Sequence, residues 1–282
     1  MKSNDKPEVL TIENSPELYS KITWRLIPLL FFCYIIAYID RINVGFAKLQ
    51  LREVLGVDEA VFGSVYGLGA GLFFIGYFLF EIPSNLVMAR VGARIWIARI
   101  MIIWGFVAAA MMFIHSTTMF YVMRFVLGVA EAGFYPGMIL YLTYWYPARE
   151  RAKVIALFAT GAVIAGIIGS PVSGAILGMH GAAGLAGWQW LFLLEGIPAV
   201  LLGLVVLFVL PNGPAKARWL SPEEKEVVKR RLDAEIDQRK ELVHFKFSQA
   251  LKSKWVWLLC LVYFLLNVGG YGYELWMPSI IN

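Results

Sequence analysis

The stretch MRFVLGVAEAGFYPG, residues 123–137, places two charged side chains in an otherwise apolar run. Arg124 and Glu131 are seven residues apart, so a helix carries them on one face, with Gly128 between them and Tyr135 one turn further on. A charge at bilayer depth costs about 3 kcal/mol or more, and such residues usually face a protein interior or a water-filled cavity. This stripe predicts a polar path through a membrane protein.

The composition supports the same class. Hydrophobic residues make up 59% of the 282 residues and charged residues only 16%, with a mean hydropathy of +0.66. An ordinary soluble domain carries about 25% charged residues. The chain is therefore expected to be an all-α membrane protein that crosses the bilayer several times, with the lipid bilayer as a partner.

Seven apolar stretches are long enough to cross a bilayer, which takes about 20 residues each. They cover residues 24–46, 60–84, 94–114, 117–143, 153–178, 188–210 and 255–280. We expect four parts: a cytoplasmic tail at 1–21, a six-span bundle at 22–210, a cytoplasmic linker at 211–254, and a seventh span at 255–282 that begins an incomplete second bundle.

Basic residues predict the orientation. The tail, the linker and the loops on their side hold twenty-one lysines and arginines, whereas the opposite side holds only Lys48 and Arg52. Cytoplasmic loops carry such an excess, so the N-terminus is expected in the cytoplasm. The linker contains SPEEKEVVKRRLDAEIDQRK, a charged helix that starts at Ser221, and its mixed charges argue against a nucleic-acid partner.

The sequence contains no motif for a disulfide framework, a metal site or an enzyme. Cys33 and Cys260 lie in apolar runs without a CxxC or His-rich motif, which indicates neither a disulfide nor a metal site. No HExxH, GxSxG or Gly-rich phosphate loop is present, so we expect no enzyme and no cofactor other than a proton as coupling ion.

Four strings together resemble one family: YIDRINVGFA, FEIPSNLVMARVGARIWIARIMIIWG, RFVLGVAEAGFYPG and YWYPARERAK. They are similar to the anion:cation symporter family of the major facilitator superfamily, which includes bacterial tartrate, phthalate and sugar-acid permeases. The resemblance implies twelve spans in two six-span bundles around a central site near the bilayer midplane. The chain would then hold the N-terminal bundle, the linker and span 7, and be truncated at Asn282.

In this family spans 1 and 4 line the central cavity, so Asp40, Arg41, Arg124 and Glu131 are expected to converge there. Our hypothesis is that Arg41 and Arg124 hold an organic anion, because the guanidinium fork suits a carboxylate. Asp40 and Glu131 would carry the coupling proton. The alternative is a structural ion pair between Asp40 and Arg124 that positions the two spans.

Further candidates come from the resemblance. Tyr77 matches a substrate-contacting tyrosine, with simple membrane stacking as the alternative. In span 7, Asn267, Tyr271 and Glu274 share a face that would border the cavity. Glu81 is expected at a helix end or gate, and Glu195 is expected to be structural.

The loop between spans 2 and 3 departs from the superfamily's GxxxDxxGR pattern. Asn85 and Ala89 replace its glycine and aspartate, while Gly92 and Arg94 keep the tight turn and one positive charge of the expected gate. The usual gating ion pair of the aspartate is therefore not expected.

Taken together, these features predict a proton-coupled symporter of a small organic anion, either tartrate-like or an aromatic carboxylate. It is expected in the bacterial inner membrane, and as a monomer if full length. The alternatives are an uncoupled facilitator for the same anions, and a membrane sensor or inactive fragment.

Overall fold

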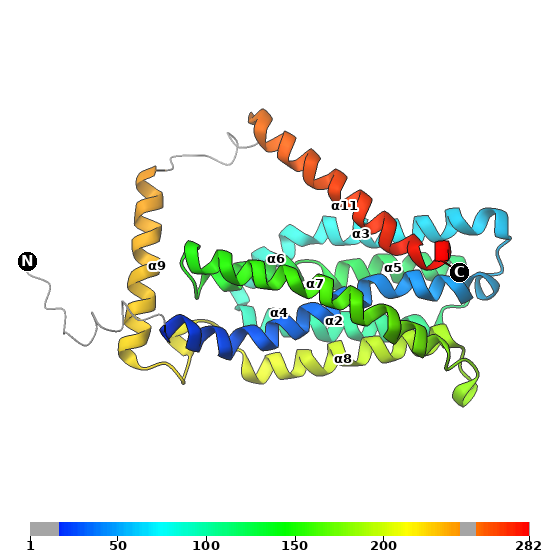
Figure 1. Cartoon of the computed structure of the whole chain (residues 1–282), viewed down its shortest axis with the longest axis horizontal. Helices are drawn as coiled ribbons and strands as arrows, with labels where there is room; N and C mark the ends of the chain where they lie inside the picture. The colour runs from blue at the N-terminus through cyan, green and yellow to red at the C-terminus, as the bar shows by residue number, and fades with distance from the viewer. Residues whose placement is uncertain (1–16, 243–251, 282) are drawn as a thin grey trace, which may run out of the picture.

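The computed structural model describes residues 17–242 and 252–281, and these residues are almost entirely helical (Figure 1). The helices are α2 Glu17–Leu55, α3 Glu59–Val91, α4 Ala93–Ala110, α5 Thr117–Glu131, α6 Phe134–Thr143, α7 Ala148–Leu177, α8 Gly187–Val209, α9 Pro222–Leu242 and α11 Lys254–Ile281. Single turns of 3-10 helix lie at Met111–Phe113, Ala182–Gly184 and Pro214–Lys216.

Seven segments of the described chain are long and apolar enough to cross a membrane, which confirms the all-α fold and the predicted number of spans. The first span is longer than expected, because α2 begins at Glu17 and continues to Leu55. Most of the expected tail, residues 1–16, lies outside the described residues, as does the linker segment 243–251.

The six spans α2 to α8 lie side by side in one bundle (Figure 1). Helix α4 packs along α8, α3 along α5, and α2 against both α7 and α8. Glycines permit the closest approaches: a Cβ on Gly105 of α4 would lie 2.7 Å from the Gly196 carbonyl of α8. Small residues of this kind are typical of interfaces between membrane helices, where close backbone packing replaces the hydrophobic effect.

The fourth span is interrupted, which corrects the expected continuous helix over 117–143. Helix α5 ends at Glu131 and α6 starts at Phe134. Between them Gly133 has φ +83°, a left-handed conformation that glycine adopts without steric penalty. Tyr135, just past the break, still faces α2, because the centre of its ring lies 5.4 Å from that of Tyr34.

Helix α9 stands across one end of the bundle (Figure 1). Its start at Ser221 is confirmed, because Ser221 Oγ accepts from the Glu224 amide at 3.2 Å and the Glu224 carboxylate accepts from the Ser221 amide at 2.8 Å. Glu224 also pairs with Lys21 of α2 at 2.8 Å. We call this end of the bundle the α9 end.

Helix α11 leans away from the bundle and meets it through its last turns (Figure 1). Its first half is exposed, whereas Leu275 is buried. The Tyr66 hydroxyl of α3 donates to the Leu275 carbonyl at 3.1 Å, and a Cβ on Gly45 of α2 would lie 3.1 Å from the same oxygen. This contact brings residues 271–276 beside the interior of the bundle.

Candidate functional site

The centre of the site is an ion pair between two expected residues. Arg41 of α2 and Glu131 of α5 lie 2.9 Å apart, from Nη2 to Oε2, and the Glu131 side chain is only 1% exposed. The second arm of the guanidinium, Nη1, donates to the Tyr271 hydroxyl of α11 at 3.0 Å. Three helices that are far apart in the sequence therefore meet at one cation.

Asp40 precedes Arg41 and is fully buried. Its carboxyl group lies beside that of Glu131, within hydrogen-bonding reach once either group carries a proton. Asp40 Oδ2 and Glu131 Oε1 have no hydrogen-bond partner among the described residues. One proton placed between these two carboxyl groups would satisfy both of them, since a protonated carboxyl group donates to a carboxylate.

Arg124, the other cation of the stripe, is buried without an ion pair in the described part of the chain. Its Nε and Nη1 have no hydrogen-bond partner, and its guanidinium lies 4.8 Å from the centre of the Phe73 ring. The alternative of a structural Asp40–Arg124 ion pair is not what the structure contains: Arg41 makes the pair, and Glu131 is its partner. A buried guanidinium with unused donors is suited to an anionic ligand.

Aromatic rings of α3 cover one side of the site. The Arg41 guanidinium lies 5.1 Å from the centre of the Tyr77 ring and 5.6 Å from that of Phe73. Tyr77 is half-buried, and at this distance its ring makes a cation–π contact with Arg41. Whether Tyr77 contacts substrate or only stacks stays a prediction.

Two of the three span 7 candidates reach the site. Tyr271 contacts Arg41, and Glu274 Oε1 accepts from the Tyr38 hydroxyl at 2.6 Å. Asn267 instead donates to the Tyr263 carbonyl of its own helix at 2.7 Å. Only the C-terminal part of this helix face therefore lies against the bundle, and contact of these residues with substrate stays a prediction.

The expected gate residues lie nearer the α9 end. Gly92 joins α3 to α4 with φ +99°, and Asn212, which follows α8, accepts from the Arg94 amide at 3.0 Å through Oδ1. Glu81 is half-buried and lines a cavity of about 410 Å³ between α3 and α6. These positions are compatible with roles in gating, which stay predictions.

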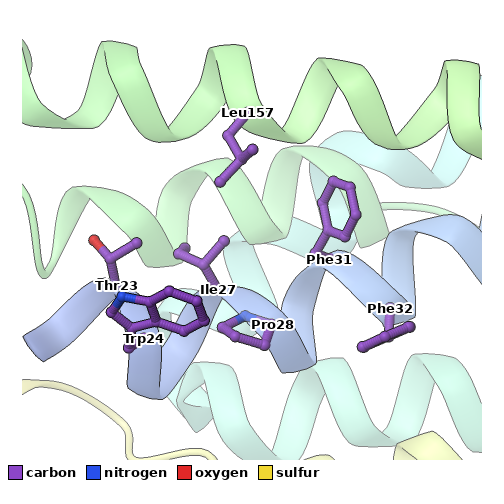
Figure 2. Close-up of a pocket in the computed structure, with 7 residues that line it drawn as sticks. All are labelled: Thr23, Trp24, Ile27, Pro28, Phe31, Phe32 and Leu157. Carbon is purple, nitrogen blue, oxygen red and sulfur yellow. The ribbon is translucent and has the colours of Figure 1, made fainter. Parts of the chain in front are cut away.

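A second cavity, of about 270 Å³, opens between α2 and α7 (Figure 2). Its lining is apolar apart from Thr23 and consists of Thr23, Trp24, Ile27, Pro28, Phe31, Phe32 and Leu157. It offers no charge to an organic anion, so the charged cluster around Arg41 is the better candidate site.

Sequence reasoning missed several residues of this region. Tyr38 was not singled out, although it lies two residues before Asp40, and Phe73 lies one turn before Tyr77. Asn43, which donates to Asp40 Oδ1 at 3.4 Å, is a polar residue inside the quoted string YIDRINVGFA and carried a usable signal. Among the described residues, no group of three or more His, Cys, Asp or Glu side chains is placed to hold a metal ion.

Several curated proteins align with nearly all of this chain. An Agrobacterium vitis protein named "Putative tartrate transporter" is 50% identical over 274 residues, which are 97% of this chain and 60% of that protein. "Putative metabolite transport protein NicT" of Pseudomonas putida is 52% identical over 94% of this chain and 60% of its own length. "Inner membrane transport protein RhmT" of Escherichia coli is 40% identical over 90% of this chain and 58% of its own length. The chain spans about 60% of the length of these curated relatives.

Solved structures share the fold. A bacterial homologue of the human lysosomal transporter Spinster, in an inward-facing and occupied conformation, matches with a TM-score of 0.62 at 22% identity over 74% of this chain and 47% of that chain. The xylose transporter XylE of E. coli, in a partially occluded inward-open conformation, matches with a TM-score of 0.63 at 15% identity over 78% of this chain and 57% of that chain. Because the family model for the Major Facilitator Superfamily matches residues 30–282, the chain belongs to this superfamily.

Proposed function

We propose that this protein takes part in proton-coupled symport of a small organic anion by alternating access. The observation that carries the proposal is the ion pair between Arg41 and Glu131. An ionised Glu131 occupies the guanidinium that a substrate carboxylate needs. Protonation of Glu131 removes its charge and frees Arg41 for the substrate, so proton binding favours anion binding.

Charge balance supports the same linkage. Asp40 and Glu131 together balance Arg41 and Arg124 in a buried region. Adding a carboxylate leaves an uncompensated negative charge, which is unfavourable in a medium of low dielectric constant. One proton on the Asp40–Glu131 pair restores neutrality, and this is the proton that we propose is carried with the substrate.

The substrate we propose is a small carboxylate, tartrate-like or aromatic. Arg41 and Arg124 supply the donors for its carboxylate groups, while Tyr77 and Tyr271 supply hydroxyl groups and ring faces. The name of the Agrobacterium vitis relative, which refers to tartrate, supports the dicarboxylate as a first substrate to test. Nε and Nη1 of Arg124, which have no hydrogen-bond partner among the described residues, are the donors that we assign to a second carboxylate group.

The contact with α11 supports a role for the seventh helix in the transport cycle. Tyr271 holds Arg41 and Tyr38 holds Glu274, so both hydrogen bonds join α2 to α11. A substrate carboxylate that takes the Arg41 donors would displace Tyr271 and weaken this contact. We propose that this exchange of partners at Arg41 links substrate binding to movement of α11. We also propose that the protein lies in a cell membrane with its α9 end in the cytoplasm.

Uptake of labelled tartrate into proteoliposomes that contain the 282-residue chain tests the proposal. We expect an inwardly directed proton gradient to raise the initial uptake rate about ten-fold. Equal uptake with and without the gradient would favour an uncoupled facilitator. Saturable tartrate binding without uptake would contradict transport and favour a sensor.

A further inference from the structure

A third buried carboxyl group lies near the charged cluster, within electrostatic range of Asp40. Glu195 of α8 is 6% exposed, and its Oε1 accepts from the Ser173 hydroxyl of α7 at 2.8 Å. Its Oε2 has no hydrogen-bond partner among the described residues. An ionised carboxylate with an unused oxygen is unfavourable at such a position, whereas a protonated one can donate from that oxygen.

Asn43 connects Glu195 with Asp40. The Trp188 amide of α8 donates to Gln50 Oε1 of α2 at 3.1 Å, which sets the register of these two antiparallel helices. Asn43 precedes Gln50 by seven residues and Glu195 follows Trp188 by seven, so both lie ~10 Å from this contact. Asn43 and Glu195 are therefore at the same level of the two helices, and Asn43 Nδ2 also donates to Asp40 Oδ1 at 3.4 Å.

The remaining neighbours do not neutralise Glu195. Helix α7 contributes the neutral Ser173, and α2 contributes the neutral Asn43 and the acidic Asp40, which lies within electrostatic range. Helix α4 packs against this turn of α8 with small residues, since a Cβ on Gly196 would meet Gly105 and Ala109. The two guanidiniums serve three buried carboxyl groups, so one proton is needed for neutrality before any substrate binds.

We propose that Glu195 is a second proton-binding site, linked to Asp40 by the Asn43 amide so that one of the two carboxyl groups is protonated at a time. In one state Glu195 Oε2 carries the proton and donates to Asn43 Oδ1, while Asn43 Nδ2 donates to the ionised Asp40. In the other state the amide is rotated, Asp40 carries the proton and donates to Oδ1, and Nδ2 donates to the ionised Glu195. Each state holds one proton and one negative charge.

The place of this site in a transport cycle rests on the proposed function, but its protonation does not. Infrared difference spectra of the purified chain in nanodiscs, recorded between acidic and alkaline pH, report buried protonated carboxyl groups directly. We expect Glu195→Gln to remove one such band. Because a neutral Asp40 lets Glu195 ionise, we expect Asp40→Asn to lower the amplitude of that band about two-fold at neutral pH. Asn43→Leu should weaken this effect of Asp40→Asn, because only the repulsion through space then remains.

A second variant tests the proposal if Glu195→Gln fails to fold. Ser173→Ala removes the donor to Oε1 and is expected to shift the frequency of the same band, whereas Ser170→Ala, on the same helix, is expected to leave it unchanged because its hydroxyl bonds to the Gly166 carbonyl. An unchanged band in Glu195→Gln, or in both Ser173→Ala and Asp40→Asn, would overturn the proposal. If the bands respond as expected while a proton gradient has no effect on uptake, the proton site stands and the proposed symport fails.

Discussion

Arg41 Nη2 lies 2.9 Å from Glu131 Oε2, and this contact joins α2 to α5 inside the bundle. The two residues were expected in the same region but in separate tasks, one holding the anion and the other the proton. Their direct contact makes the tasks competitive, because an ionised Glu131 and a substrate carboxylate use the same guanidinium. This relationship determines what each substitution should do.

Glu131→Gln imitates a permanently protonated Glu131. We expect tartrate affinity at alkaline pH to rise to the value that the unmodified chain reaches at acidic pH, because Arg41 is no longer held by a carboxylate. Uptake driven by a proton gradient should fall about ten-fold, while exchange of internal for external tartrate continues. Proteoliposome assays measure the gradient-driven uptake and the tartrate exchange separately. Glu59→Gln, at an exposed ion pair with Arg52, is the matched control; unchanged gradient-driven uptake in Glu131→Gln would contradict the coupling role.

Arg124→Met separates binding from stability. The guanidinium balances one of the two buried carboxylates, so its removal leaves a negative charge uncompensated and should destabilise the fold by about 1 kcal/mol. A shift of that size lowers the melting temperature by about 2–4 °C. Tartrate affinity should fall about ten-fold or more, because the donors for a carboxylate are lost.

Scanning fluorimetry and equilibrium binding measure the two effects of Arg124→Met, with Arg52→Lys at an exposed position as the control. Arg124 would be a structural residue, and not an anion contact, if the variant were less stable and still bound tartrate normally.

Gly128→Ala tests the packing of the stripe itself. A Cβ at Gly128 would collide with the Phe73 carbonyl of α3, so the two helices have to separate. Overpacking of this kind costs about 1–3 kcal/mol, and the separation would also displace Phe73 from the two guanidiniums. We expect a lower melting temperature and weaker tartrate binding together. Gly166→Ala on α7 is the control because a Cβ there meets open space; equal melting temperatures for both variants would refute the close approach.

Much of this fold could be predicted because length and hydropathy identify membrane spans in a sequence. The positions of Asp40, Arg41 and Glu131 along their helices were also predictable from a rise of about 1.5 Å per residue. The direct ion pair between Arg41 and Glu131 was not predictable, because the sequence does not state how helices are rotated against each other. The break at Gly133 and the link from Asn43 to Glu195 depend in the same way on contacts between distant segments.

The orientation of the bundle was predicted from the distribution of basic residues, and labelling can test it. Both native cysteines are first removed by Cys33→Ser and Cys260→Ser. A single cysteine then replaces either Ala183, in the loop between α7 and α8, or Lys216, shortly before α9. Because the Lys216 side carries nearly all the basic residues, we expect it to face the cytoplasm. A maleimide that cannot cross membranes should then label Ala183→Cys in spheroplasts, and Lys216→Cys only after the membrane is opened. The reverse labelling pattern would place the α9 end outside and invert the direction of the proton gradient assigned to the site.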